Sequence, residues 1–184
     1  DVLLADLAAR AGRWPAARAL ATLARRARAA GLAGLAAEVA LLAATGAAAR
    51  GRDGEATKGF TALVQGNPAR PWVRIAAETG LAGVEARTPR GVPRALARLR
   101  RVAAFLDRVR SALPGSWLRA SFVAERLDPY LARVDLLLAR GRAADRREAE
   151  ALLDALAARH LLGAKAPAAE GPRLARLRAR LESI

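Results

Sequence analysis

The chain has 184 residues, of which 53% are hydrophobic and 4% aromatic, and its 32 basic against 17 acidic side chains give a formal net charge of +15. This apolar content is sufficient for a packed core, and the dominance of Ala and Leu over β-branched residues predicts an all-α protein. The absence of cysteine excludes disulfides and cysteine nucleophiles within the chain and predicts a cytoplasmic location. No apolar run reaches the roughly 20 residues of a membrane span, so we expect no membrane partner.

Glycine and proline divide the first half into short helices. A first apolar face ends at Gly12, and Pro15 should open the next helix, since proline is tolerated in a first helical turn. Asp53 is a candidate N-cap at the end of a predicted loop over residues 46–54. The helices expected here cover residues 3–12, 15–30, 32–45, 54–65 and 72–86.

The second half predicts longer helices. Pro114 and Gly115 should end the first of them, and Ser116 is a candidate N-cap for the next. Pro129 should kink or split that next helix at Asp128, because it removes a backbone donor and crowds the preceding turn. Asp145 is a candidate N-cap for the helix after that. The expected elements are helices over 94–113, 116–141 and 145–162, a linker over 163–171 and a last helix or coiled coil over 172–184.

Paired short helices with small residues where they approach, an apolar residue between them and a closing breaker are typical of tetratricopeptide repeats. The second pair carries this pattern best, with Ala40, Ala43, Ala44, Ala47, Ala56, Phe60, Leu63 and Pro68. Weaker matches are Gly12, Ala17, Ala21 and Ala24 in the first pair, Ala95, Leu99 and Val102 in the third, and Ala149, Leu153 and Leu156 in the fourth. The resemblance implies a right-handed α-α superhelix of about four pairs over residues 1–162 plus a C-terminal helix. A different hairpin array or an irregular bundle is the alternative.

Residues 116–184 carry a narrower resemblance. Leu-Arg-Ala-Ser-Phe-Val at 118–123, then Tyr130, the run at 134–141 and the helix end at 158–162 are similar to the repeats that precede the protease domain of bacterial CHAT proteins. Pro129 departs from the usual continuous helix. The resemblance implies a caspase-like cysteine protease domain elsewhere in a longer protein, in intramolecular contact with this segment. The lack of methionine and the helical pattern at the first residue agree with a segment of a longer protein.

The sequence predicts no catalytic, cofactor or metal site. His160, the single histidine, has no nucleophile or orienting acid in a convincing relationship to it. Glu150 and Asp154 lie one turn apart, but helix-start electrostatics and ion pairing explain them. The glycines at 51, 54 and 59 lack the Lys-Ser/Thr ending and the strand of a phosphate-binding loop.

Two arginine clusters are the candidate partner-binding residues. Arg94, Arg98, Arg101 and Arg108 lie at helical spacing opposite an apolar face, and Arg18, Arg25 and Arg28 form a second cluster. They indicate a solvated face, an acidic protein partner, or RNA or DNA. Base stacking is less favoured, since Trp14, Trp72, Trp117 and the other aromatics mostly fall in predicted core stripes.

The last helix carries a candidate coiled-coil seam, formed by Leu174, Leu177, Leu181 and Ile184. This seam could pack on a preceding helix or continue into a longer coil. Taken together, the sequence predicts a non-catalytic interaction scaffold, acting as the sensing or docking arm of a larger CHAT-type protease, with nucleic-acid binding as the alternative.

Overall fold

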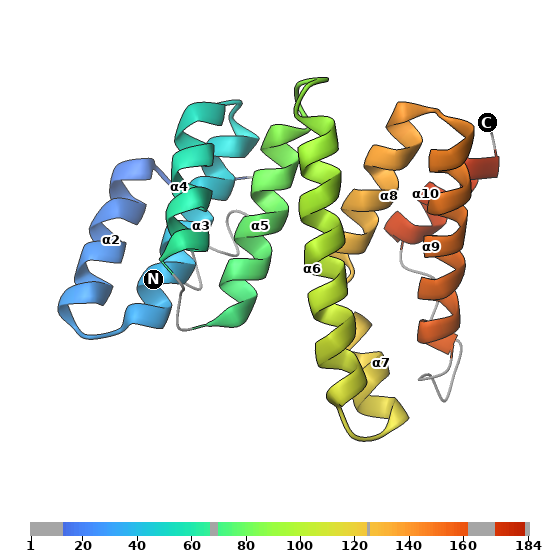
Figure 1. The fold of residues 1–184 in the computed structure, drawn as a ribbon. Coiled ribbons are helices and arrows are strands. Elements are labelled where there is room, and N and C mark those ends of the chain that lie inside the picture. The colour runs from blue at the N-terminus through green and yellow to red at the C-terminus, as the bar shows by residue number, and fades with distance from the viewer. Residues whose placement is uncertain (1–12, 67–69, 125, 162–171, 183–184) are drawn as a thin grey trace. The chain divides into compact units, whose positions relative to one another are not determined.

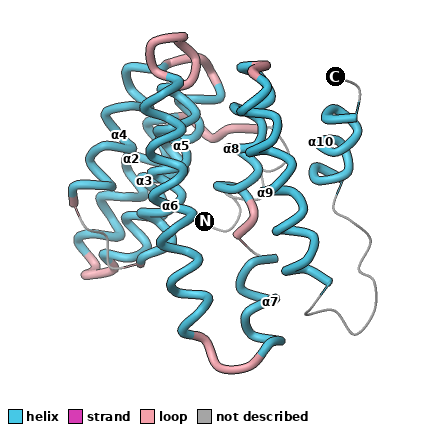
Figure 2. The backbone as a smooth tube through the Cα atoms, turned by 45° about the vertical axis from the view of Figure 1, so that its right-hand side comes forward, coloured by secondary structure: helices cyan, strands magenta, loops and turns pink. Residues whose placement is uncertain are grey.

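The computed structural model describes residues 13–66, 70–124, 126–161 and 172–182. These residues form helices and short connections, with no strand among them (Figure 2), which confirms the all-α prediction. The chain divides into two compact units, Asp1–Gly91 and Val92–Ile184, called here the first and the second unit. The sequence predicted a single array over residues 1–162, and the structure adds a division at Gly91. The predicted linker over 163–171 lies outside the described residues.

Successive helices of the first unit pack against each other, and α3 also packs against α5 (Figure 1). The described helices of this unit are α2 (Ala17–Ala29), α3 (Ala33–Ala49), α4 (Asp53–Gln65) and α5 (Pro71–Glu85). The prediction for residues 3–12 falls outside the described residues. The stacking of neighbouring helices agrees with the predicted helical array at this level.

Left-handed glycines end two of these helices. Gly31 and Gly51 both have a φ of 72°, a conformation that costs glycine little. After Gly31 the amide of Leu32 donates to the Ala27 carbonyl, and after Gly51 the amide of Arg52 donates to the Ala47 carbonyl, both at 2.9 Å. This 6→1 bond is the signature of a Schellman motif, which satisfies the last helical carbonyls and reverses the chain in a few residues.

The loop predicted over residues 46–54 is wrong over most of its length. Helix α3 continues to Ala49, and Gly46 is buried inside it against the indole of Trp14, where a Cβ would lie 2.9 Å from a ring carbon. Gly46 is therefore a close-packing residue and not a helix breaker. The N-cap prediction for Asp53 is also wrong, because Asp53 is already the first residue of α4 and its carboxylate accepts from Arg87.

Small residues let the helices of the first unit approach closely. Phe60 is only 1% exposed, and a Cβ on Gly80 of α5 would come within 2.4 Å of its ring. A Cβ on Gly59 of α4 would come within 2.9 Å of the Ala44 side chain on α3. The core also contains the predicted repeat positions Ala44, Ala47, Ala56, Phe60 and Leu63. The predicted pattern therefore lies where these helices meet.

Three arginines tie segments of the first unit that are far apart in the chain. Arg50 donates to the carbonyls of Trp14 and Pro15 at 2.9 and 3.0 Å, across 36 and 35 residues. Arg70 pairs with Glu38 across 32 residues. Arg87 pairs with Asp53 across 34 residues and also donates to the Ala48 carbonyl at 2.7 Å. A similar long-range contact thus recurs along the unit.

The second unit contains the longest and the shortest of the described helices, with 21 residues in α6 and 9 in α7. Its described helices are α6 (Val92–Ala112), α7 (Ser116–Ala124), α8 (Asp128–Arg140), α9 (Ala143–Leu161) and α10 (Pro172–Glu182). Helix α8 packs on α6 and α9, and α7 packs on α6 and α9. The split at Pro129 is confirmed, since α8 starts at Asp128 with Pro129 in its first turn. The N-cap prediction for Asp145 is wrong, because α9 starts at Ala143 and Asp145 is a buried residue of its first turn.

Leucine and valine dominate the core of the second unit. Its largest fully buried side chains are Leu96, Leu99, Leu106, Val134, Leu137, Leu153 and Leu156. Tyr130 is buried with them, and its hydroxyl lies 3.0 Å from the Asp107 carboxylate, to which it donates. Such a partner is what a buried tyrosine requires.

Helix α10 packs against α8 and α9. Of the predicted coiled-coil seam, Leu177 is buried and Leu181 is half-buried, so at these two residues the seam packs on preceding helices. The side chain of Leu174 and the whole of Ile184 lie outside the described residues.

Candidate interaction surface

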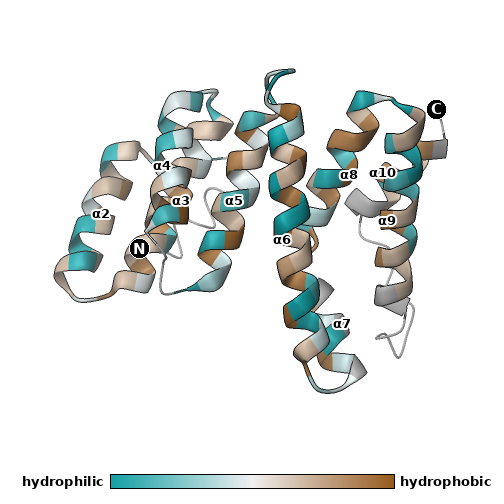
Figure 3. Ribbon diagram, in the orientation of Figure 1, coloured by the Kyte–Doolittle hydropathy of each residue, from teal (hydrophilic) through white to brown (hydrophobic). Residues whose placement is uncertain are grey.

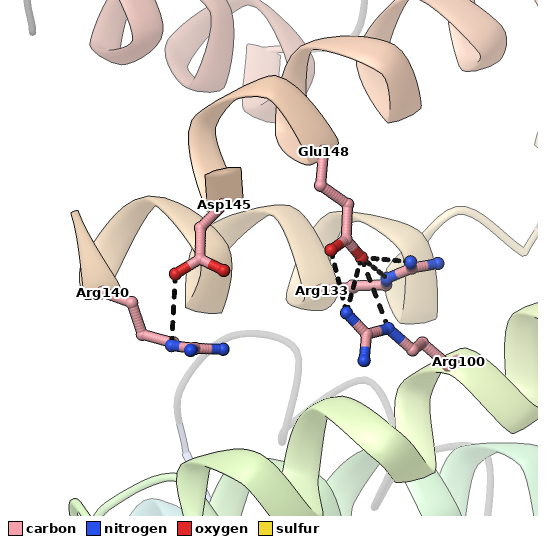
Figure 4. Close-up of polar contacts among 5 residues, drawn as sticks. All are labelled: Arg100, Arg133, Arg140, Asp145 and Glu148. Atoms are coloured by element: carbon pink, nitrogen blue, oxygen red, sulfur yellow. Dashed lines mark hydrogen bonds and ion pairs between the residues drawn. The ribbon is translucent and has the colours of Figure 1, made fainter. Parts of the chain in front are cut away.

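Two carboxylates of the second unit form ion pairs with arginines of neighbouring helices. The carboxylate of Glu148 on α9 accepts from Arg100 of α6, with Arg100 Nη2 at 2.8 Å from Oε2, and from Arg133 of α8, with Arg133 Nε at 3.1 Å from Oε1 (Figure 4). Arg140 Nε lies 3.2 Å from Asp145 Oδ2. One carboxylate therefore connects three helices, and a second connects α8 to α9.

These pairs determine the ionisation of Glu148. Burial raises the pKa of the Glu148 carboxyl, but the hydrogen bonds and positive charges of Arg100 and Arg133 outweigh burial and lower the pKa below its ordinary value of 4.5. The carboxylate is therefore ionised at neutral pH, and the two arginines are neutralised within the fold.

The outer face of α6 carries arginines that are not paired in this way. Arg94, Arg101 and Arg108 are exposed, and within the described part of the chain they form no ion pair. Arg98 is half-buried and already interacts within the chain. Figure 3 shows hydrophilic and hydrophobic bands alternating along α6. The buried residues of α6, such as Leu99 and Leu106, lie on one side of the helix, and Arg94, Arg101 and Arg108 lie on the other.

Sequence reasoning missed one member of this outer face. Phe105 lies four residues after Arg101 and three before Arg108, and its side chain is 40% exposed. It therefore occupies the position that the arginine spacing leaves vacant. The sequence indicated this position, because the arginines of α6 follow the alternating three- and four-residue spacing of one helix face and Phe105 fills the gap in it. We call Arg94, Arg98, Arg101, Phe105 and Arg108 the α6 stripe.

The second predicted cluster lies on α2 in the first unit. Arg18, Arg25 and Arg28 are exposed, and Arg25 donates to the Thr22 hydroxyl at 3.3 Å. A hollow of about 590 Å³ lies along the same helix, lined in part by Leu20, Leu23 and Arg26. The sequence pairs this helix with residues 3–12, which lie outside the described residues.

The prediction that the tryptophans lie in core stripes is wrong for two of the three. Trp72 is 49% exposed and Trp117 is 67% exposed. Trp72 lies in the first turn of α5 with the Arg70 guanidinium 5.4 Å from its ring centroid, a cation–π contact. Trp117 lies at the start of α7 beside the exposed Leu118. Both aromatics are near helix starts, where the helical period is a weak guide to burial.

The two acidic residues that lie one turn apart on α9 are on the surface. Glu150 and Asp154 are exposed. No group of His, Asp and Glu suited to hold a metal ion occurs among the residues that the structure places. His160 lies in the last turn of α9, and its side chain is outside the described set. None of the described helices combines the length and apolarity needed to cross a bilayer.

Comparison with known proteins identifies no relative. No family model matches the chain, and neither the curated proteins nor the solved structures contain a match.

Proposed function

We propose that this chain is a non-catalytic helical docking scaffold that binds an acidic protein partner through the α6 stripe. The observation that carries the proposal is the contrast between two sets of arginines in one unit. Arg100 and Arg133 are neutralised by Glu148, whereas Arg94, Arg101 and Arg108 are exposed and without an ion pair among the described residues. Unneutralised, aligned arginines attract and orient a complementary negative surface.

A tetratricopeptide-like array is the proposed architecture behind this scaffold. In the first unit the contacts Arg50–Trp14, Arg70–Glu38 and Arg87–Asp53 join residues that are 36, 32 and 34 positions apart in the chain. A tetratricopeptide repeat has about 34 residues. The proposal extends this repeat to a right-handed superhelix of about four helical pairs, located in the cytoplasm. Such arrays bind through extended surfaces instead of single pockets.

The parent protein is proposed to be a CHAT-type protease, with this chain as its sensing or docking arm. Support comes from the resemblance of residues 116–184 to the segment that precedes the protease domain in that family. The catalytic His and Cys would then lie outside residues 1–184. Sequencing the flanking coding region tests this point, and a flanking region that encodes no caspase-like His and Cys would contradict it.

Two charge-matched variants test the docking surface. One carries Arg94→Gln, Arg101→Gln and Arg108→Gln on α6, and the other carries Arg18→Gln, Arg25→Gln and Arg28→Gln on α2, so both lose three positive charges. The probe is a fluorescent poly-glutamate peptide of about 15 residues, measured by anisotropy across a salt series. We expect the α6 variant to bind at least about 10-fold more weakly than the wild type and the α2 variant to change much less.

Equal losses in both variants would mean that only net charge attracts the peptide, and the docking proposal would then fail. The alternative is a nucleic-acid module, for which the observation is the aromatic Phe105 among arginines. A single-stranded RNA of matched charge is the competing probe. Preference for this RNA, with a steep salt dependence, would favour the alternative.

A further inference from the structure

We infer that the α6 stripe selects an acidic helical segment that carries an apolar side chain between its carboxylates, and that Phe105 is the contact for that side chain. This inference rests on the proposed function, because it specifies which acidic partner the same surface accepts. Phe105 would determine which acidic partner binds, whereas the arginines attract acidic partners in general.

The position of Phe105 is the first reason. It lies inside the stripe, one turn from Arg101 and one turn from Arg108, and not at an edge of the stripe. Its side chain is 40% exposed, although Leu106 beside it in the chain is 1% exposed. An apolar side chain held in water between two cations gains free energy when another apolar group covers it.

The spacing of the arginines is the second reason. Side chains three or four residues apart on a helix lie about 5–6 Å apart, and Arg94 and Arg108 are about 21 Å apart along the axis at a rise of about 1.5 Å per residue. Carboxylates at the same spacing on a partner helix can face these arginines in register. Guanidinium groups also bind carboxylates through two parallel hydrogen bonds, which adds geometric selectivity.

Small side chains beside the stripe are the third reason. Ala97 and Ala104 are exposed on α6. Ala97 lies one turn before Arg101, and Ala104 lies one residue before Phe105. They leave room for a second helix to approach the backbone of α6 along this side. Helices pack at interaxial distances of 8–10 Å, depending on the side chains at the contact.

A peptide segment fits these features better than a nucleic acid does. Single-stranded nucleic acids are held by successive aromatic side chains on which successive bases stack. The α6 stripe offers one aromatic and otherwise only arginines. One central apolar contact flanked by cations instead matches one apolar residue flanked by acids.

Two synthetic helical peptides test the inference. Each has about 15 residues with glutamates at three- and four-residue spacing on one face, and they differ only in leucine or alanine at the centre of that face. Dissociation constants are measured by anisotropy for the wild type, Phe105→Ala, Phe105→Leu, Arg101→Gln and Trp117→Ala. Circular dichroism of each variant verifies the helical fold.

We expect the wild type to bind the leucine peptide about 5- to 10-fold more tightly than the alanine peptide. Phe105→Ala should abolish this preference and Phe105→Leu should retain it. Arg101→Gln should weaken both peptides by a similar factor, and Trp117→Ala, an exposed aromatic outside the stripe, should leave the preference unchanged.

The outcomes separate the two proposals. Equal binding of both peptides by the wild type, or a preference that survives in Phe105→Ala, overturns the role of Phe105 and leaves the docking proposal intact. Failure of the wild type to bind either peptide at low salt overturns both.

Discussion

In the first unit the closest approaches between helices occur at glycines, whereas in the second unit one shared carboxylate joins three helices. Gly80 accommodates the Phe60 ring and Gly59 contacts Ala44. The helices of the first unit can approach this closely because glycine has no side chain at these two positions. In the second unit Glu148 connects α6, α8 and α9 through two arginines, so the contact depends on charge. Helix packing should therefore be sensitive to added volume at Gly59 and Gly80 in the first unit and to lost charge at Glu148 in the second.

The largest expected effect is loss of the central aromatic in the first unit. Phe60→Ala removes a side chain that is 1% exposed, and large-to-small changes of this kind cost about 3–5 kcal/mol. Hydrogen exchange resolved by mass spectrometry should show faster exchange in α3, α4 and α5. Phe105→Ala is the matched control, because that ring is 40% exposed and its loss should change stability by less than about 1 kcal/mol.

A pair of glycine substitutions in α5 should have opposite signs. In Gly80→Ala the new methyl would lie 2.4 Å from the buried Phe60 ring, so we expect destabilisation by about 1–3 kcal/mol. Gly83→Ala meets no atom within 4 Å and should stabilise by about 0.5–1 kcal/mol through helix propensity. Urea unfolding followed by circular dichroism measures both. If both variants were stabilised, close approach at Gly80 would not limit the packing of this unit.

In the second unit we expect that neutralising the carboxylate of Glu148 weakens the packing of three helices. Glu148→Gln leaves Arg133, whose side chain is 16% exposed, without its counter-charge, at a cost of about 1–2 kcal/mol. Hydrogen exchange should accelerate in α6, α8 and α9. Glu150→Gln on the same helix is the control, since Glu150 is exposed, and an equal effect there would show that the shared pairs contribute nothing specific.

The smallest expected effect is a pH dependence confined to the same pairs. The pKa of Glu148 in the folded chain is lowered below 4.5, so the folded state binds this proton less readily than the unfolded state. The stabilisation is therefore complete above the unfolded pKa and is lost as pH falls through the folded pKa. The stability difference between wild type and Glu148→Gln should shrink in urea titrations below about pH 4.5. A difference that is constant down to pH 3 would contradict this linkage.

Much of the helical pattern could be predicted from local sequence. Pro129 sets the start of α8 because proline restricts its own turn wherever it occurs. The repeat positions Ala56 and Phe60 are buried as expected, since helical periodicity places residues of one face together. The arginine spacing likewise predicted the exposed positions of Arg94, Arg101 and Arg108 on α6, whereas Arg98 is half-buried.

The rest depended on contacts between distant residues. Gly46 resembles a helix breaker in the sequence, but α3 continues through it, and the ring of Trp14, 32 residues away in the chain, occupies the space where a side chain would lie. The two partners of Glu148 lie 15 and 48 residues away in the chain, beyond any helical period. Phe105 is exposed because the core covers the opposite side of α6, and in the sequence only its spacing among the arginines indicates this, since its apolar type alone favours burial.

The two partners of Glu148 also have a consequence for the order of folding. Closing a longer loop loses more chain entropy, so the bond from Arg133, 15 residues away, should form before the bond from Arg100, 48 residues away. Helices α8 and α9 would then associate early, and α6 would dock on a carboxylate that already carries one arginine. In stopped-flow experiments Arg133→Gln should slow refolding, whereas Arg100→Gln should mainly accelerate unfolding.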